Sequence, residues 1–367
     1  MKTASQRKGG SFLTRIFPAP RYLKMPAIGV DISDRSVKYA SFVERNGAHR
    51  LRRFGEHTIP EGVIAKGKIV QPDALGDVLR ALRREVRTDI IRASLPEEHA
   101  YIFQTTIPTE TQEQEIRTML EFQLEEHVPV PVRDAVFDYE FLLPLPGHTH
   151  REVTVSVYSK TIVAGYIDSF VKAGFTPLSL EVEARAVARA TIPEGDAGTY
   201  MLVDFGSLRT GIAIFSRGSV CFTSTVAIGG EPLSTTIRDT LKVSDAEVEK
   251  IKNEQGLRVK DNPELALSMQ GAISSLRDEI SKHLNYWHTH MDAVGNAMPP
   301  VEKIILCGGS SNLAGLSEYL SANLRITTTV GNVWTNAFSF DDVIPELDHA
   351  HSLGFATTLG LALRSTD

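Results

Sequence analysis

Short apolar runs separated by turn-forming residues mark the start of the predicted fold, from about residue 26. Three runs rich in apolar and β-branched side chains predict strands at 27–31, 37–43 and 51–59. Ser33-Asp34-Arg35 separates the first two runs, and Asn46-Gly47, a strong hairpin signal, separates the second from the third. The pattern therefore predicts three consecutive strands joined by tight turns.

The period of the pattern then changes from two residues to between three and four. One face of a predicted helix at 73–87 carries the apolar side chains Leu75, Val78, Leu79, Leu82 and Val86. A further apolar run at 90–95 predicts a strand that Pro96 ends. We therefore expect residues 26–100 to form one α/β unit.

Residues 101–183 show a different order of elements. The pattern predicts strand, helix, strand, strand, helix and strand, with Gly174 just after the second helix. Thr109 and Gln112 have the spacing of a capping box at the start of the first helix. This order is typical of a compact α+β unit, so we expect a small subdomain here.

The opening pattern returns in the second part of the chain. Met201–Ser207 repeats Ile28–Asp34, since in each an apolar strand ends at an aspartate and a turn of small residues follows. An internal repeat of this kind predicts two similar α/β halves that face each other. The second half would span 184–367.

Helical periodicity interrupts this second half and predicts a helical subdomain at about 231–299. Pro232 lies at the start of its first helix, and two more helices are expected at 244–254 and 266–291. The remaining pattern predicts a strand at 301–307 and helices at 313–324 and 355–363.

Composition narrows the class of protein. The 367 residues carry a formal net charge of −6, so no bulk attraction to nucleic acid is expected. The two cysteines, Cys221 and Cys307, lie in predicted strands, which fits a reducing compartment better than a disulfide framework. No apolar run reaches the roughly 20 residues needed for a transmembrane segment. We therefore expect a cytoplasmic protein.

Residues 1–25 differ from the rest of the chain in charge. They contain the basic residues Lys2, Arg7, Lys8, Arg15, Arg21 and Lys24 and no acidic residue. One interpretation is a flexible basic tail. The other is a surface contact with anionic lipid or an acidic partner.

The two aspartate turns are the first candidates for chemistry. A carboxylate at the end of a buried strand, next to a turn of small residues, lies where backbone N–H groups can contact phosphates. Two such turns in facing halves predict a triphosphate held from both sides, with Asp31 and Asp204 holding Mg²⁺ through water. A single turn of this kind is more often an ordinary hairpin, but its repetition favours a binding site.

A third turn follows the strand at 301–307. Gly308-Gly309 and the polar residues Ser310, Ser311 and Asn312 predict a place where a flat or anionic group meets backbone and a helix N-terminus. The alternative is a plain strand–helix connection.

Other charged clusters have simpler interpretations. Ser244 and Glu247 have capping-box spacing, and Glu247 and Lys250 can form a pair on one helix face. His283, His288 and His290 lack the i, i+4 spacing of a metal-binding helix. No G-x-x-x-x-G-K-[ST] loop occurs, so a P-loop is excluded as the phosphate binder.

Four motifs, in order, resemble those of the actin/Hsp70/sugar-kinase superfamily. Gly29–Lys38 looks like the first phosphate motif, Val203–Thr210 the second, Leu306–Leu316 the adenosine motif and Ala356–Ala362 the second connecting motif. The resemblance implies a duplicated α/β fold, ribonuclease H-like in each half, that binds ATP and Mg²⁺. It implies phosphate or metal contacts at Asp31, Ser33, Ser36, Lys38, Asp204, Gly206, Ser207 and Thr210. It implies adenosine contacts at Glu247, Lys250, Gly308, Gly309, Ser310 and Asn312.

Within this superfamily the chain most resembles the PilM family of type IV pilus assembly proteins. The insert at 101–183 stands where PilM and FtsA carry an extra subdomain, and the stretch Ile107–Pro129 is similar to PilM. Ile228-Gly229-Gly230, followed by Ala246-Glu247 and Lys250, matches a PilM pattern. The resemblance implies a cytoplasmic scaffold that docks the N-terminal peptide of PilN and so joins the pilus inner-membrane complex. It leaves self-association open.

Two departures from the superfamily pattern qualify the expected chemistry. Ser33 stands where many members have glycine, and a serine restricts the turn. No clear acid or glutamine for activating water is found, so we expect slow or absent ATP hydrolysis.

Two alternatives of the same superfamily stay open. One is an FtsA-like division scaffold, although we expect no terminal amphipathic helix of the kind that tethers FtsA to membrane. The other is a sugar or acid kinase, which would need a catalytic aspartate facing a substrate hydroxyl.

Overall fold

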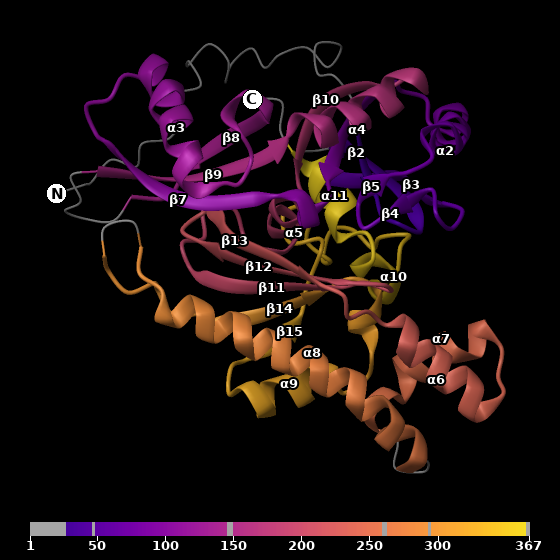
Figure 1. Ribbon diagram of the computed structural model, residues 1–367. Helices are drawn as coiled ribbons and strands as arrows, with labels where there is room; N and C mark the ends of the chain where they lie inside the picture. Colours follow the sequence, from indigo (N-terminus) through magenta and orange to yellow (C-terminus); the bar gives the residue numbers. More distant parts are fainter. Residues whose placement is uncertain (1–26, 46–47, 145–149, 259–262, 293–294, 365–367) are drawn as a thin grey trace.

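Two similar α/β halves face each other across a cleft, and a smaller insert lies beside the first half (Figure 1). The computed structural model describes residues 27–45, 48–144, 150–258, 263–292 and 295–364. The expectations for the N-terminal tail and for the Asn46-Gly47 turn lie outside these residues.

The first half is built on a five-stranded sheet in the order β10-β6-β1-β2-β3. Its strands are β1 (Ile28–Ile32), β2 (Ser36–Arg45), β3 (Ala48–Thr58), β6 (Ile90–Leu95) and β10 (Thr176–Val182). β1 is antiparallel to β2 and parallel to β6, as expected for a hairpin followed by a helical crossover. The predicted strands at 27–31, 37–43, 51–59 and 90–95 are confirmed.

The second half repeats this topology strand for strand, in the order β15-β14-β11-β12-β13. Its strands are β11 (Thr199–Phe205), β12 (Thr210–Ser216), β13 (Ser219–Val226), β14 (Lys303–Cys307) and β15 (Thr328–Val330). β11 is antiparallel to β12 and parallel to β14, which is the arrangement around β1. The predicted duplication is therefore confirmed.

Two helices pack between the sheets and connect the halves. α5 (Glu183–Thr191) and α11 (Ala356–Leu363) pack on each other, α5 against β13 and α11 against β1. They approach so closely that a Cβ on Gly360 would lie 1.8 Å from the carbonyl oxygen of Ala186. This is the helix-on-helix packing that the connecting motif implies.

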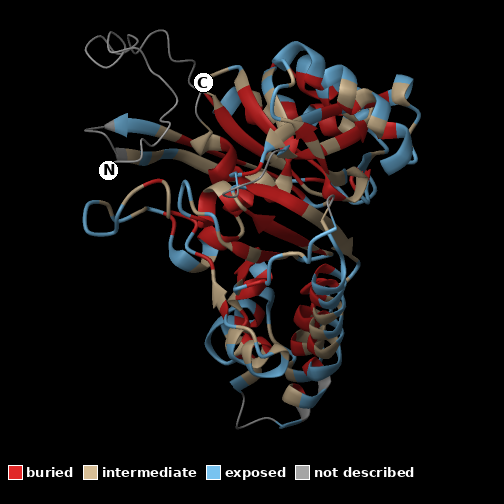
Figure 2. Cartoon of the chain, turned by 90° about the vertical axis from the view of Figure 1, so that its left-hand side faces the viewer, coloured by how far each residue is buried: buried red, intermediate tan, exposed pale blue. Residues whose placement is uncertain are grey.

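The first sheet is covered on its other face by α2 (Pro72–Glu85) and α4 (Lys160–Lys172), which pack on each other (Figure 1). The short hairpin β4 (Ile64–Ala65) and β5 (Lys68–Ile69) precedes α2, and the 3₁₀ turn η2 (Glu97–His99) follows β6. Burial is concentrated in the two sheets and in the helices between them (Figure 2).

The insert is shorter than the expected unit at 101–183. Its sheet has the order β7-β9-β8, from β7 (Tyr101–Pro108), β8 (Ala135–Phe141) and β9 (His150–Ser159). Its helix α3 (Glu113–His127) contributes to a separate core, and the turn η3 (Val132–Asp134) precedes β8.

The last two elements expected in that unit, α4 and β10, belong to the first half instead. β10 pairs in parallel with β6, and Tyr166 and Phe170 of α4 are buried in the core of the first half. An amphipathic pattern shows that a helix has a buried face but does not show which sheet covers it. The expected capping box is also wrong, because Gln112 is the N-cap of α3 and its side chain makes no capping bond.

The helical part of the second half contains α6 (Glu231–Leu241), α7 (Asp245–Glu254), the turn η4 (Gly256–Arg258) and α8 (Pro263–Thr289). The capping box of Ser244 and Glu247 is present at the start of α7. After β14 the chain forms a 3₁₀ turn, η5 (Gly309–Asn312), and α9 starts only at Leu316 and ends at Leu324. The Gly-Gly turn therefore leads into a 3₁₀ turn and not directly into an α-helix. The short helix α10 (His349–Leu353) precedes α11.

Among the described helices none is both long and apolar enough for a membrane span. Cys221 and Cys307 are buried free thiols, as their places in apolar strands suggested.

Candidate functional site

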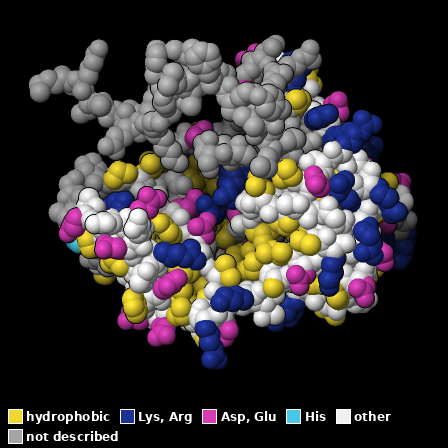
Figure 3. Space-filling model, turned by 90° about the horizontal axis from the view of Figure 1, so that it is seen from above, with side chains coloured by type: hydrophobic (Ala, Val, Ile, Leu, Met, Phe, Trp, Pro, Cys, Tyr) yellow, Lys and Arg dark blue, Asp and Glu magenta, His cyan; other side chains and the backbone are white. Residues whose placement is uncertain are grey.

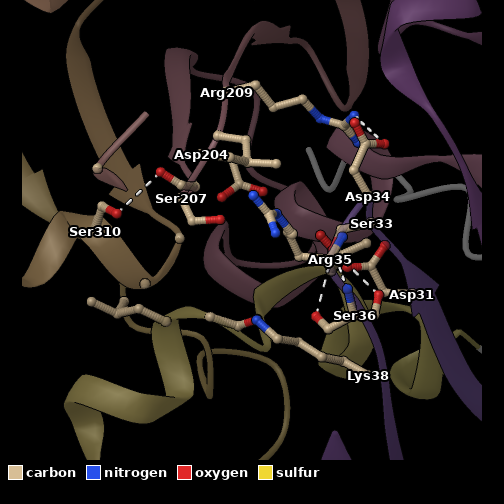
Figure 4. A pocket seen from close by; sticks show the side chains of 18 of the residues that line it. Asp31, Ser33, Asp34, Arg35, Ser36, Lys38, Asp204, Ser207, Arg209 and Ser310 are labelled. Carbon is tan, nitrogen blue, oxygen red and sulfur yellow. Dashed lines mark hydrogen bonds and ion pairs between the residues drawn. The ribbon is translucent and has the colours of Figure 1, made fainter. Parts of the chain in front are cut away.

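A pocket of about 360 Å³ lies in the cleft between the halves. Its walls come from the β1–β2 turn, the β11–β12 turn, the turn after β14 and the starts of α6 and α11. Figure 4 shows side chains from the first two turns pointing into the same space. The duplicated topology places these turns opposite each other, since β1 and β11 are equivalent strands.

The β1–β2 turn presents Asp31 at the end of a buried strand. The Ser94 hydroxyl donates a hydrogen bond to the Asp31 carboxylate at 2.6 Å. Ser33 closes the turn, because its N–H donates to the Ser36 carbonyl at 2.9 Å and its hydroxyl accepts from the Ser36 N–H at 3.1 Å. Ser33 does not have positive φ, so the turn does not require glycine at this position.

The β11–β12 turn presents Asp204 in the equivalent position. Gly206 closes it by donating to the Arg209 carbonyl at 3.0 Å, and the Ser310 hydroxyl donates to the Gly206 carbonyl at 3.0 Å. The turns after β11 and β14 are therefore joined directly. Gly308 has φ +84°, and a Cβ there would lie 2.3 Å from Asp204 Oδ1, so only glycine fits.

The electrostatics of the pocket favour a bound cation. Burial raises the pKa of Asp31, although Ser94 and Lys38 oppose the shift. Burial, followed by the charge of Asp31, raises the pKa of Asp204 to about 6. Two buried carboxylates that repel each other would be relieved by a divalent ion between them.

The pair fits Mg²⁺ held largely through water and phosphate oxygens. The described residues contain no group of three or more acidic, histidine or cysteine ligands that could hold a metal alone. Mg²⁺ prefers one or two carboxylates and keeps several waters, and phosphates supply the remaining oxygens.

Ten of the fourteen predicted site residues line this pocket: Asp31, Ser33, Ser36, Lys38, Asp204, Gly206, Ser207, Gly308, Gly309 and Ser310. Lys38 extends into it and donates to the Gly354 carbonyl at 2.7 Å (Figure 4). The shared cleft expected for the two aspartate turns is thus present.

The other four predicted residues do not line the pocket. Thr210 is fully buried, and its hydroxyl donates to the Ile228 carbonyl at 2.6 Å. Asn312 donates to the carbonyls of Gly309 and Ala350, so its amide is used within the turn. Glu247 is occupied by its capping bonds to Ser244. Lys250 is exposed on the outer face of α7.

Glu249 and Lys252, two positions later on α7, line the pocket in place of Glu247 and Lys250. The buried Lys252 ammonium donates to Glu249 at 2.8 Å and to the Ser234 hydroxyl at 3.2 Å. The sequence Glu247-Val248-Glu249-Lys250-Ile251-Lys252 contains the spacing twice. Packing of Val248 into the core selects the second copy, because it fixes the rotation of the helix.

Sequence reasoning also missed a charged cluster behind the two aspartate turns. The Arg209 guanidinium pairs with Asp34 at 3.2 Å, with Glu98 and, at 3.8 Å, with Glu183. Glu183, at the start of α5, lines the pocket, and burial raises its pKa well above the ordinary value. These acids come from three separate segments, so no local pattern could reveal the cluster.

Glu97 completes this cluster on the side of Asp204. Its carboxylate accepts a hydrogen bond from the Ala184 N–H at 2.8 Å, near the start of α5. Burial, followed by the charge of Asp204, raises the pKa of Glu97 to about 8. The only local signal was an acidic pair directly after Pro96.

Residues 29–366 match the family described as Type IV pilus assembly protein PilM. The chain belongs to this family. The solved PilM-PilN type IV pilus biogenesis complex contains a similar fold, with a TM-score of 0.73 and 20% identity over 94% of this chain and 99% of that one. The expected resemblance to PilM and the expected actin-like fold are therefore confirmed.

Two other proteins of the superfamily are similar at lower identity. MreB 5 of Spiroplasma citri, solved with AMPPNP bound, has a TM-score of 0.50 and 13% identity over 91% of this chain and 94% of that one. Cell division protein FtsA of Bacillus subtilis is 24% identical over 217 residues, 53% of this chain. The match spans only about half of FtsA (48%), so it carries less weight than the PilM match.

Proposed function

We propose that this PilM-family chain is a cytoplasmic scaffold of the type IV pilus inner-membrane assembly platform. In this proposal it binds ATP with Mg²⁺ in the cleft and docks the N-terminal peptide of a PilN-type partner beside the insert. The observation that carries the nucleotide part is the placement of Asp31 and Asp204, from equivalent strands of two halves, in one pocket.

The pocket offers a partner for each part of a nucleotide. The two aspartate turns and Lys38 line the space where phosphates would lie, and the two carboxylates would hold Mg²⁺, which neutralises phosphate charge. Glu249 and Lys252 lie where sugar hydroxyls could meet a carboxylate and an ammonium. The MreB relative that contains AMPPNP supports a nucleotide in this fold.

The same geometry supports binding with slow turnover. Glu183 is an acid in the pocket wall, but its raised pKa favours the protonated form, and a protonated carboxyl cannot accept a proton from water. We therefore expect hydrolysis below about 1 s⁻¹, the low end of ordinary enzyme rates. Faster turnover, with transfer of phosphate to a substrate hydroxyl, would instead indicate a kinase and would contradict this expectation.

The peptide part rests on a surface between the insert and the first half. Figure 3 shows an apolar hollow there. Exposed apolar side chains come from both sides, with Val136 of β8 39% exposed, Ile167 of α4 37% and Leu178 of β10 42%. In the described sheets β8 and β10 each pair on one side only, so each leaves an edge to which an extended peptide could add.

The charge of the rim fits a basic peptide, as segments next to a membrane helix on the cytoplasmic side often are. Glu125 and Glu126 of α3 are exposed, and Glu121 is half-exposed and pairs with Arg117 at 3.7 Å. The PilM-PilN complex supports a PilN-type partner for this chain.

Calorimetry with a synthetic N-terminal peptide of the PilN-type partner tests the docking. Leu178→Asp with Ile167→Asp should weaken peptide binding at least tenfold, because each places a charge where an apolar contact is expected. Leu267→Asp, on the exposed face of α8, is the matched control and should bind normally. Equal peptide binding by the Leu178→Asp, Ile167→Asp double variant and by the control would overturn the proposed docking site. Mg-ATP titration of the same proteins tests the cleft separately.

A further inference from the structure

The end of the first half that is remote from the cleft carries a surplus of positive charge. β1 runs toward the cleft and ends near Asp31, and β6 and β10 run parallel to it. β3 has the same direction, since it is antiparallel to β2. The starts of these strands and the ends of α2 and α4, which precede β6 and β10, therefore gather at the remote end.

We call this surface the arginine face and define it by eight basic residues: Arg50, Arg52, Arg53, Arg80, Arg83, Arg84, Arg87 and Lys172. Two hydrogen bonds join its parts, since Arg53 donates to the Glu85 carbonyl and Arg83 to the Gly174 carbonyl, both at 3.1 Å. In Figure 3, which looks onto this end, blue side chains gather on the first-half side of the apolar hollow.

The acids at this end are fewer than the eight basic residues and do not neutralise the face. They are Glu44, Asp77, Glu85, Asp89 and Asp168. Asp77 forms an ion pair with Arg80 at 2.6 Å, and the Glu85 carboxylate is hydrogen-bonded to Tyr39 and His57. Arg50, Arg52, Arg84 and Arg87 are exposed and have no ion pair with another described residue. The whole chain has a net charge of −6, so this surplus is local.

We propose that the arginine face binds an anionic phospholipid surface. Guanidinium groups bind phosphate oxygens in a bidentate manner, and all but one of the eight residues are arginine. Exposed apolar side chains lie at the same end. Val43 is close to the end of β2, and Val171 directly precedes Lys172 at the end of α4. Cations beside apolar side chains fit the membrane interface, where both find partners.

The apolar hollow also opens toward this end (Figure 3). A bound membrane would then lie on the side from which a membrane-anchored partner's peptide would come.

Flotation of the full chain with vesicles tests the proposal. The protein should float with an equal mixture of phosphatidylglycerol and phosphatidylcholine, not with phosphatidylcholine alone, and added salt should release it. Arg50→Glu, Arg84→Glu and Arg87→Glu together should lower partitioning more than tenfold, because each charge near the surface contributes roughly fivefold in affinity.

A matched control carries the same change of charge on the second half: Lys250→Glu, Lys282→Glu and Arg325→Glu, all at exposed positions. It should float like the wild type. Both triple variants should keep wild-type thermal melting and Mg-ATP binding, which separates this test from that of the proposed function. A corresponding set of Arg→Gln changes should give a smaller loss in the same direction.

Four outcomes would overturn the proposal. The first is no flotation of the wild-type chain, and the second is equal loss in the control. In the third, binding survives the triple reversal and disappears only when residues 1–26 are removed, which assigns it to the tail. In the fourth, duplex DNA binds more tightly than anionic vesicles and the reversal abolishes that binding, which makes the face a nucleic-acid surface.

Discussion

Asp31 and Asp204 are two carboxylates that destabilise the cleft while it holds no cation. Both have raised pKa values because they are buried, and the charge of Asp31 adds to the shift of Asp204. Residues that serve folding alone would rarely be placed in this way, since buried charges are normally paired. The cost is consistent with a site arranged for a cation and phosphates.

The first prediction separates binding from stability. Asp204→Asn removes one charge and keeps the shape, so Mg-ATP affinity should fall at least tenfold while the free energy of unfolding stays the same or rises. Calorimetry with Mg-ATP and urea denaturation measure the two quantities. Loss of stability in step with affinity would mean that Asp204 acts through the fold.

The second prediction concerns pH. The folded-state pKa values of Asp204 and Glu97 are raised to about 6 and about 8 from ordinary values of 3.8 and 4.5. Between the ordinary and the raised values the folded protein binds more protons than the unfolded chain. With respect to these two acids, the protein is therefore most stable below about pH 4, where they are protonated, and it loses stability as pH rises through about 6 for Asp204 and about 8 for Glu97, by on the order of a few kcal/mol.

Urea denaturation at a series of pH values measures this loss. Glu97→Gln, which keeps the acceptor for the Ala184 N–H, should remove the part between about pH 6 and pH 8. Glu247→Gln, at an exposed helix cap, should leave that part unchanged. A flat profile in the wild type would contradict the assigned pKa values.

The third prediction distinguishes the two lysines of α7. Lys252→Met keeps the aliphatic stem and removes the ammonium, so ATP affinity should fall roughly tenfold, the value of one hydrogen bond to a charged group. Lys250→Met should bind ATP like the wild type, because Lys250 is exposed outside the pocket lining. Titration of both variants with a fluorescent ATP analogue gives the comparison, and the reverse order would restore the sequence-based assignment.

At the scale of elements, the contact between α5 and α11 holds the halves together. The fourth prediction is that Gly360→Ala destabilises the protein by roughly 1–3 kcal/mol or more, because its Cβ would overlap the Ala186 carbonyl. Gly271→Ala on α8 is the control, since nothing lies within 4 Å of its Cβ, and should stabilise by roughly 0.5–1 kcal/mol. Urea denaturation measures the change in the free energy of unfolding. A change of the same sign in both variants would contradict this packing.

The sequence predicted an element well where that element depends on residues close to it in the chain, and poorly where it depends on distant residues. The strands ending at Asp31 and Asp204 and the cap of α7 follow from neighbours in the chain, and these predictions agree with the structure. The placement of α4 and β10 depends on pairing with β6, which is about 80 residues away along the chain. A helical pattern alone also fits two rotations of α7, and only packing of Val248 decides between them.

The candidate site shows the same division. Its turns were predictable because each is a short motif, and ten of the predicted residues line one pocket. Glu97, Glu98 and Glu183 were not, since they reach the site through the folding of η2 and α5 against the second half. A residue that reaches the site only when several distant segments fold together cannot be recognised from a local sequence motif.

At the scale of the whole molecule, charged contacts cross between the halves and between the insert and the second half. Arg209 of the second half pairs with Asp34, Glu98 and Glu183 of the first half and of α5. Arg217, in the β12–β13 turn, pairs with Glu152 of the insert. The insert and both halves are thus joined by charged contacts, and those of Arg209 lie at the cleft.

Arg209 is the centre of the contacts at the cleft, because one guanidinium faces three carboxylates. Its removal would leave the carboxylates of Asp34 and Glu98 without their shared cation and would break the contact with Glu183, so these contacts between the halves would be lost. Asp34 would still accept hydrogen bonds from the N–H groups of Lys66 and Gly67, so its turn should persist. Without these contacts the two halves are held together less strongly at the cleft.

The last prediction is that Arg209→Gln opens the cleft and accelerates ATP release at least tenfold while both halves stay folded. Small-angle scattering should show a larger radius of gyration for the variant, and stopped-flow displacement should give the release rate. Arg35→Gln is the control, since Arg35 also lines the pocket but its only ion pair with another described residue is to exposed Glu61 at 3.7 Å. If both single variants scatter and release ATP alike, the three-acid cluster around Arg209 does not hold the cleft closed.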